Sequence, residues 1–201
     1  HVRSRRQRQM CIRDRVSADG LTHYLERPFM VIATQNPIEM EGTYPLPEAQ
    51  RDRFLARIEM GYPTRNAELD MLEHHGAADP LEKLEPVASK ERILEMIHIV
   101  REVYVAEPVK NYIVDIIAAT RESEDLRLGA SPRSSLALLR AARARAAMQG
   151  RDYAIPEDIQ VLAEPVLGHR VLASTAAQLG GRSVATIVSD IVSGVEIPDR
   201  G

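Results

Sequence analysis

A change of hydrophobic pattern at Pro63 constrains the fold of this chain more than any other feature. Before it, residues 29–34 form a continuous apolar run that ends in Gln35 and Asn36. Such a run predicts a strand buried on both faces of a parallel sheet, and residues 56–60 are a possible second strand. After Pro63, apolar residues recur at helical spacing to the end of the chain. We therefore predict an α/β segment followed by an all-helical one.

Two strands are too few for a parallel sheet that is covered by helices on both faces. We expect residues 16–75 to be the C-terminal half of an α/β core, residues 76–88 a linker, and residues 89–201 a helical domain. Residues 1–15 carry six arginines against one acidic residue, so we expect this basic segment to be disordered and a candidate for a non-native extension. The first residue is His1, which makes a fragment the expected status of the chain.

Capping residues and prolines mark the predicted helices. Thr64 and Ser89 are N-cap candidates, and prolines at 108, 132 and 156 suit first helical positions. Gly150 ends the helix that begins at Ser131-Pro132, and the last helix follows Gly180-Gly181. The apolar residues expected to face the core are Ile93, Ile97, Val100 and Tyr104; Val109, Tyr112, Ile113, Ile116 and Ile117; Leu136, Leu139, Ala142 and Ala146; Ile159, Leu162, Val166 and Leu167; Val184, Ile187, Val188, Ile191, Val192 and Val195.

Composition excludes several classes of protein. No apolar run approaches the roughly 18 residues that a membrane helix needs, and no secretory signal precedes the first element, so we expect a cytoplasmic protein. A single cysteine, Cys11, excludes an internal disulfide and a Cys-based zinc site. Adjacent His74 and His75 point about 100° apart on a helix, so we expect no metal site there. With two Phe, no Trp and a net charge of -3, nucleic-acid binding is not expected.

Two polar residues are candidates for ligand contacts. Asn36 follows the predicted strand, at the carboxyl edge where ligands bind in open α/β folds. It could equally cap the turn before Pro37. Arg133 is the second residue of a predicted helix, where the helix dipole disfavours a cation by about 0.3 to 1 kcal/mol unless an anion lies between them. This favours an anion site, and a surface arginine that extends away from the helix is the alternative.

Arg53 has a functional and a structural interpretation. Phe54 and Leu55 follow it, so their packing could hold the arginine rigidly and offer it to a phosphate on another molecule. A solvated helix end is the alternative. The predicted helix after Ser131 is also rich in arginine, a pattern that a DNA-contacting helix can show. These arginines are Arg140, Arg143, Arg145 and Arg151.

Four stretches of this sequence together resemble the MoxR family of AAA+ ATPases. They are FMVIATQNPIE from Phe29, EGTYPLPEAQ from Glu41, DRFL from Asp52 and GASPR from Gly129. The resemblance runs from about Val16 to the C-terminus. It implies a P-loop-type α/β core, of which this chain has the C-terminal half, followed by a helical lid. It also implies ATP hydrolysis coupled to chaperone-like remodelling or maturation of partner protein complexes.

The resemblance assigns a role to each of the three polar residues. Asn36 would be the sensor that orients the attacking water near the γ-phosphate. Arg53 would be the arginine finger that reaches the nucleotide of the adjacent subunit. Arg133 would be the second sensor, which contacts phosphate from the lid. The cofactors would be ATP and Mg²⁺, and the partners would be further copies in a ring, with a hexamer expected, and von Willebrand factor A domain proteins.

The sequence departs from the family pattern in one important respect. The motif GxxxxGK[ST] is absent, and the only lysines are Lys83, Lys90 and Lys110. We expect the phosphate cradle and the acidic magnesium-binding strand to lie upstream of this chain, so that residues 1–201 alone hydrolyse no ATP. Arg51 and Met40 also differ from the family pattern. A non-enzymatic helical module that binds protein or nucleic acid, and a magnesium-chelatase-type AAA+ subunit, are the alternatives.

Overall fold

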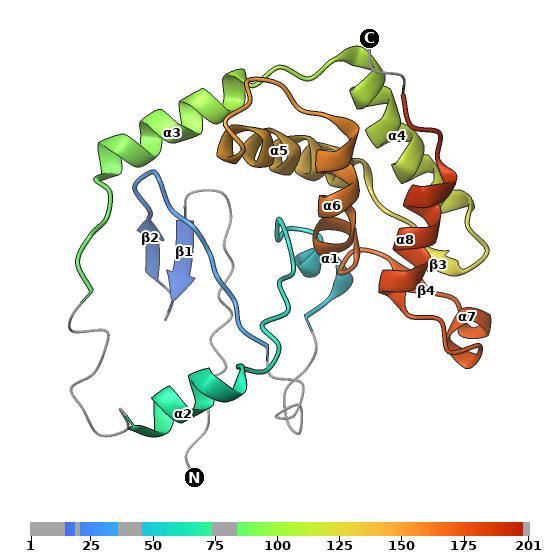
Figure 1. Cartoon of the computed structure of the whole chain (residues 1–201), viewed down its shortest axis with the longest axis horizontal. Coiled ribbons are helices and arrows are strands. Elements are labelled where there is room, and N and C mark those ends of the chain that lie inside the picture. The colour runs from blue at the N-terminus through green and yellow to red at the C-terminus, as the bar shows by residue number, and fades with distance from the viewer. Residues whose placement is uncertain (1–14, 19–20, 36–45, 74–83, 199–201) are drawn as a thin grey trace.

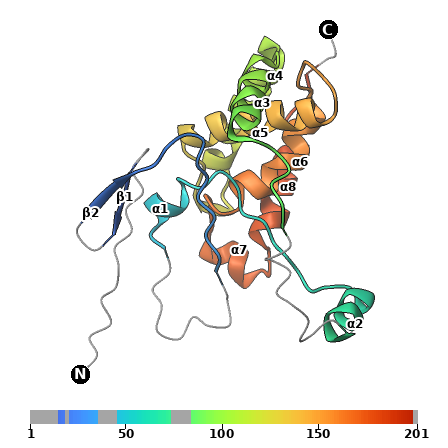
Figure 2. The same ribbon diagram turned by 90° about the vertical axis from the view of Figure 1, so that its left-hand side faces the viewer.

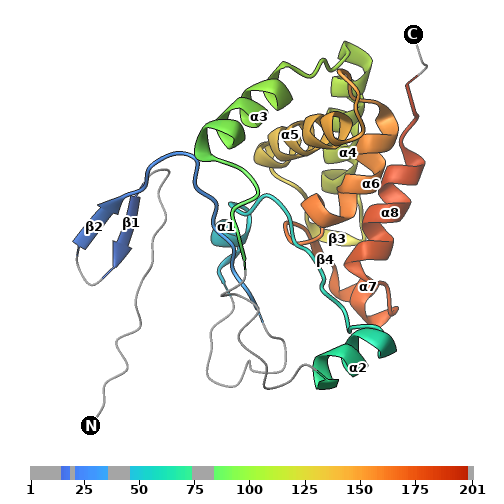
Figure 3. The same cartoon turned by 60° about the vertical axis from the view of Figure 1, so that its left-hand side comes forward.

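The computed structural model describes residues 15–18, 21–35, 46–73 and 84–198. In the first part, β1 (Arg15–Ala18) and β2 (Leu21–Tyr24) form an antiparallel hairpin, followed by α1 (Glu48–Arg51) and α2 (Arg65–Glu73). The hairpin stands apart from the helices of the second part in all three views (Figures 1, 2 and 3), and α2 does so in Figures 1 and 2. Arg15, which the charge pattern predicts to be disordered, is instead the first residue of β1.

The second part of the chain is a bundle of helices with one small sheet (Figure 1). Its elements are α3 (Lys90–Glu102), α4 (Glu107–Glu122), β3 (Leu126–Leu128), α5 (Pro132–Met148), α6 (Pro156–Leu167), β4 (Leu172–Ala173), α7 (Thr175–Leu179) and α8 (Val184–Gly194). Strands β3 and β4 pair antiparallel, and helix α6 packs against both α5 and α8. None of the described helices is both long and apolar enough to cross a membrane.

The hydrophobic core lies entirely in this second part. Among the residues whose side chains are described, the first buried one is Val103 and the last is Val192. The core contains most of the predicted apolar residues of α4, α6 and α8, and also the predicted Ala142 and Ala146 of α5. Its largest fully buried side chains are Tyr112, Ile116, Ile117, Leu138, Ile159, Leu167 and Ile187.

Local sequence signals explain the ends of most helices. The Ser89 hydroxyl accepts a hydrogen bond of 3.2 Å from the Arg92 amide at the start of α3, as its N-cap position predicts. Prolines occupy the first turns of α4, α5 and α6, where a backbone N–H is not needed. Gly150 follows α5 with a φ of 72°, a left-handed conformation that glycine adopts without steric cost.

A buried carboxylate joins the end of α5 to the start of α6. Arg151 donates two hydrogen bonds, of 2.9 and 2.7 Å, to the oxygens of Asp158, and the Nε of Arg145 lies 3.2 Å from the same carboxylate. Burial alone would raise the pKa of Asp158, but these hydrogen bonds, a third from the Ile155 amide and the two positive charges lower it overall. Two of the arginines that suggested a DNA-contacting helix are therefore engaged within the bundle.

The two predicted strands of the α/β segment do not form. Residues 29–34 and 56–60 belong to no strand, and most of their side chains are exposed, including Met30 and Ile58. The physical reason is the lack of neighbours: a strand of this apolar type is stable when flanking strands pair with its backbone and helices cover its faces. No other described segment pairs with either run. The described strands are confined to two two-stranded antiparallel sheets.

Two of the predicted helical faces also need correction. The apolar residues of α3 lie at its exposed surface, with Ile93 and Ile97 more than a third exposed. Helix α3 contacts α5, but Figure 1 shows it leading away from the rest of the bundle, so its apolar face is not covered on all sides. In α5 the buried face includes Leu138, whereas Leu136 is exposed and Leu139 only partly buried.

Candidate functional site

The loop that precedes α5 and Arg133, which contains Gly129 and Ala130, packs tightly against the C-terminal end of α4. The Thr120 hydroxyl accepts a hydrogen bond of 2.9 Å from the Ala130 amide and donates one of 2.7 Å to the Ile117 carbonyl. The Arg121 Nε donates to the Ala130 carbonyl at 2.8 Å. Gly129 lies so close to α4 that a Cβ there would come within 2.7 Å of the Thr120 carbonyl oxygen. These contacts fix where α5 begins.

Replacing Gly129 with alanine is expected to destabilise the helical bundle by about 1 to 3 kcal/mol, because backbone atoms of α4 would have to move to admit the methyl group. Gly194 is a matched control: it ends α8, and a Cβ there would meet nothing within 4 Å. Urea unfolding of the two variants measures the difference. Equal unfolding midpoints for Gly129→Ala and Gly194→Ala would contradict the close approach of the loop to α4.

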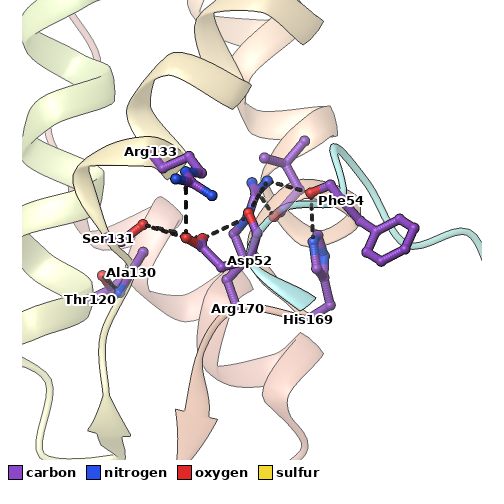
Figure 4. Close-up of polar contacts among 9 residues, drawn as sticks. Asp52, Phe54, Thr120, Ala130, Ser131, Arg133, His169 and Arg170 are labelled. Atoms are coloured by element: carbon purple, nitrogen blue, oxygen red, sulfur yellow. Dashed lines mark hydrogen bonds and ion pairs between the residues drawn. The ribbon is translucent and has the colours of Figure 1, made fainter. Parts of the chain in front are cut away.

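Arg133 lies in the first turn of α5, as the sequence predicts. Its side chain is 55% exposed, and its Nε lies 3.8 Å from an oxygen of Asp52. The Ser131 hydroxyl makes no capping bond to its own helix and instead donates to both Asp52 oxygens, at 3.2 and 3.3 Å. The anion that accompanies Arg133 at this helix end is therefore the Asp52 carboxylate (Figure 4).

The same carboxylate also contacts a buried cation, Arg170. The Arg170 Nε lies 3.3 Å from the other Asp52 oxygen, and its side chain is only 2% exposed. The Arg170 guanidinium also donates to the backbone carbonyls of Val166, at 2.9 Å, and Phe54. Burial lowers the pKa of Arg170, Asp52 opposes that shift, and the charge of Arg133 adds to it. Asp52 thus balances two arginines at once.

His169 also binds the segment that contains Asp52 and Phe54. Its Nε2–H donates to the Phe54 carbonyl at 3.1 Å (Figure 4). Burial lowers the pKa of His169, and the nearby Arg170 charge lowers it further, against the opposing effect of the Phe54 hydrogen bond. The neutral ring is therefore favoured at neutral pH. Three residues after Phe54, the Arg57 amide donates to the Pro165 carbonyl at 2.8 Å. The segment from Asp52 to Arg57 therefore runs along the C-terminal end of α6.

Arg53 lies in the middle of this anchored segment. Its neighbours Asp52 and Phe54 make the contacts just described, whereas the Arg53 side chain is exposed and has no ion pair with a carboxylate of the described residues. A fixed backbone with an outward-facing guanidinium is the arrangement that suits contact with a phosphate outside the chain. This agrees with the functional interpretation of Arg53, whose role itself stays a prediction.

The structure brings together the elements of two predicted site residues. Asp52 connects the Arg53 segment to the helix end that carries Arg133. The third residue, Asn36, lies outside the described residues. Within the ranges described, no group of three or more His, Cys, Asp or Glu side chains is placed to hold a metal ion.

Sequence reasoning missed Asp52, His169 and Arg170. One signal was available: His169-Arg170 is a pair of polar residues between the apolar pairs Val166-Leu167 and Val171-Leu172. Charged groups in such surroundings are buried and paired in folded proteins. Their partner, on a segment more than 110 residues earlier, could not be read from spacing.

Two family models match this chain. Residues 7–56 match the model described as ATPase family associated with various cellular activities (AAA), and residues 118–191 match the AAA lid domain. The first match begins inside the arginine-rich segment and includes Asp52 and Arg53. The second includes Gly129, Arg133 and Arg170. The candidate site therefore combines residues of both matches.

Individual proteins also match this chain over most of its length. The chain is 48% identical over 183 residues to the uncharacterized protein YeaC of Bacillus subtilis, covering 91% of this chain and 57% of that protein. It is 38% identical over 192 residues to the chaperone MoxR1 of Mycobacterium tuberculosis, covering 91% and 50%. A crystal structure from Cytophaga hutchinsonii, assigned as an ATPase, superposes with a TM-score of 0.82 at 34% identity, covering 92% of this chain and 59% of that one. The chain spans about half the length of these curated relatives.

Proposed function

The chain belongs to the MoxR family of AAA+ ATPases, and from that premise we propose that it supplies the lid and the arginine finger of an ATP-driven, chaperone-like remodelling machine. Arg133 contacts a phosphate of the nucleotide bound by its own subunit. Arg53 reaches the nucleotide of the adjacent subunit. Asn36 orients the attacking water.

One observation carries this proposal. The two arginines come from segments about 80 residues apart, and Asp52 joins those segments through contacts with Ser131 and Arg133. A structural role alone would require Asp52 to satisfy the buried Arg170, but it would not require exposed, cationic side chains at positions 53 and 133. Exposed arginines on a fixed support fit the binding of phosphate, which a guanidinium recognises with a planar set of donors.

The described residues fit part of a nucleotide site. Arg133, at the N-terminal end of the 17-residue helix α5, suits a phosphate group in charge and position. No described carboxylate cluster suits Mg²⁺. We propose that the phosphate cradle, the magnesium ligand and the catalytic glutamate belong to a P-loop segment that acts together with residues 16–201. When bound, ATP and Mg²⁺ supply the phosphoryl group and the charge that polarises it.

The proposed machine is a homo-oligomeric ring, with a hexamer expected, because a finger supplied to a neighbour has no target in a single subunit. Von Willebrand factor A domain proteins are its proposed partners, and the cytoplasm its proposed location. Residues 16–75 are proposed as the core part and residues 89–201 as the lid. The chaperone name of the Mycobacterium tuberculosis relative supports the remodelling role.

Arg133→Ala tests the proposal in a protein that carries this chain behind a P-loop segment. We expect ATP affinity and turnover to fall together, by about 10- to 100-fold, because a hydrogen bond to a charged group is lost. Arg140→Ala is the matched control, since Arg140 lies on the same side of α5 two turns further on and is also exposed. Isothermal titration with ATP and a steady-state ATPase assay measure both quantities. Equal behaviour of the two variants would contradict the assigned role of Arg133.

A further inference from the structure

Asp52 holds two arginines that differ sharply in their surroundings. Arg170 is 2% exposed and approaches one carboxylate oxygen at 3.3 Å, whereas Arg133 is 55% exposed and approaches the other at 3.8 Å. A buried cation requires its counter-ion, because the desolvation penalty of an unpaired buried charge is large. An exposed ion pair contributes little and is readily exchanged for another partner. The two pairings of Asp52 therefore have different strengths.

The position of the carboxylate does not depend on Arg133. The Ser131 hydroxyl donates to both of its oxygens, and the Arg170 guanidinium binds the carbonyl of Phe54, two residues further along the chain. His169 donates to the same carbonyl. If Arg133 moved away, Asp52 would still be held by Ser131 and Arg170. Figure 4 shows Asp52 in contact with both Arg133 and Arg170. The carboxylate is thus a negative charge that stays in position beside an exposed cation.

We propose that Asp52 is a positioning residue that serves as a fixed counter-ion for Arg133 and holds its guanidinium at the start of α5 until a polyphosphate displaces it. This inference rests on the proposed role of Arg133 as a phosphate contact. The carboxylate and the phosphate compete for one guanidinium. When the phosphate site at Arg133 is empty, Asp52 has two cationic partners, Arg133 and Arg170. When polyphosphate is bound, it has only Arg170. This change takes place at the residue that precedes Arg53 in the chain.

Competition between Asp52 and polyphosphate for Arg133 predicts a change in affinity that a purely structural role of Asp52 does not predict. Asp52→Asn removes the competing charge, so polyphosphate should bind beside Arg133 more tightly, by about two- to five-fold if the exposed pair contributes 0.4 to 1 kcal/mol. The same change leaves Arg170 without its counter-ion, so the urea midpoint of unfolding should fall. Affinity and stability are expected to move in opposite directions. A residue that only supports the fold would lower both.

The experiment uses the 201-residue chain and sodium tripolyphosphate. Backbone amide resonances of residues 133–135 are followed by NMR during titration, so binding by arginines elsewhere does not enter the measurement. Asp190→Asn is the matched control, because it removes one negative charge from an exposed pair with Arg182. Its affinity for tripolyphosphate at residues 133–135 should equal that of the unchanged chain. Should Asp52→Asn fail to fold, the double variant Asp52→Asn with Arg170→Met removes both charges and leaves no buried cation unpaired.

The outcomes separate this inference from the proposed function. Tighter binding in Asp52→Asn or in the double variant, together with weakened binding in Arg133→Ala, supports both. Unchanged or weaker binding in Asp52→Asn, with the Arg133→Ala loss intact, overturns the counter-ion role and leaves the proposed function standing. Binding that is unaffected by Arg133→Ala contradicts the proposed function itself.

Discussion

Arg53→Ala is expected to lower kcat for ATP hydrolysis by about 10³-fold or more, with nucleotide affinity nearly unchanged, in rings that combine this chain with a P-loop segment. The physical reason is that a finger stabilises the charge that develops on the transferring phosphoryl group in a neighbouring subunit. It contributes little to ground-state binding in its own subunit. The contacts of Asp52 and Phe54 fix the backbone that carries Arg53, which reduces the ordering cost of placing its charge beside the phosphate.

Two further variants sharpen this result. Arg53→Lys should recover little activity, because a compact ammonium lacks the planar set of donors of a guanidinium. Arg65→Ala, which removes an exposed arginine from α2, should leave kcat unchanged. The ATPase assay and a nucleotide-binding titration are run on the same preparations. Loss of nucleotide affinity in Arg53→Ala comparable to its loss of kcat would show that Arg53 contributes to ground-state binding.

Amide hydrogen exchange is expected to divide the described chain near Val103. Amides in the buried faces of α4, α5, α6 and α8 should exchange at least about 10³-fold more slowly than those of residues 24–35 and 46–73, because only the former need a global opening to exchange. Helix α3 has no buried residue and should be less protected than α4. The bundle would then be the part of the described chain that opens last.

Exchange followed by mass spectrometry on peptides of the 201-residue chain measures this contrast. Peptides from residues 46–73 and from α4 provide the decisive comparison. Similar protection in both parts would mean that the first part has a core of its own, and our account of the missing strands would be wrong. Protection of α3 equal to that of α4 would contradict its exposed position.

The sequence predicted the helical bundle well because its signals are local. A capping serine, a proline in the first turn and a run of apolar residues at 3.6-residue spacing act within one helix, so Ser89, Pro132 and Gly150 mark observed boundaries. The prediction that the apolar face of α3 is buried was wrong, because periodicity indicates which side of a helix is apolar but not whether another element covers that side.

The absence of the predicted strands and the contacts of Asp52 could not be predicted from the sequence, for a shared reason. Whether residues 29–34 form a strand depends on neighbouring strands, and whether Asp52 pairs with Arg170 depends on a contact across 118 positions. Arg133 was located from the charge rule for a helix start, but the rule could not say that the nearby anion is Asp52. Long-range contacts decide these features, and a single sequence carries little information about them.

The central claim is that one subunit's Arg53 completes the site of its neighbour. It is tested most directly by mixing two inactive proteins, one with Arg53→Ala and the other with its P-loop lysine replaced, each carrying this chain behind a P-loop segment. The account predicts that ATPase activity returns in the mixture, because an intact P-loop in one subunit then meets an intact Arg53 from the other. If mixed rings demonstrably form and no activity returns, Arg53 acts within its own subunit or only structurally, and the claim is contradicted.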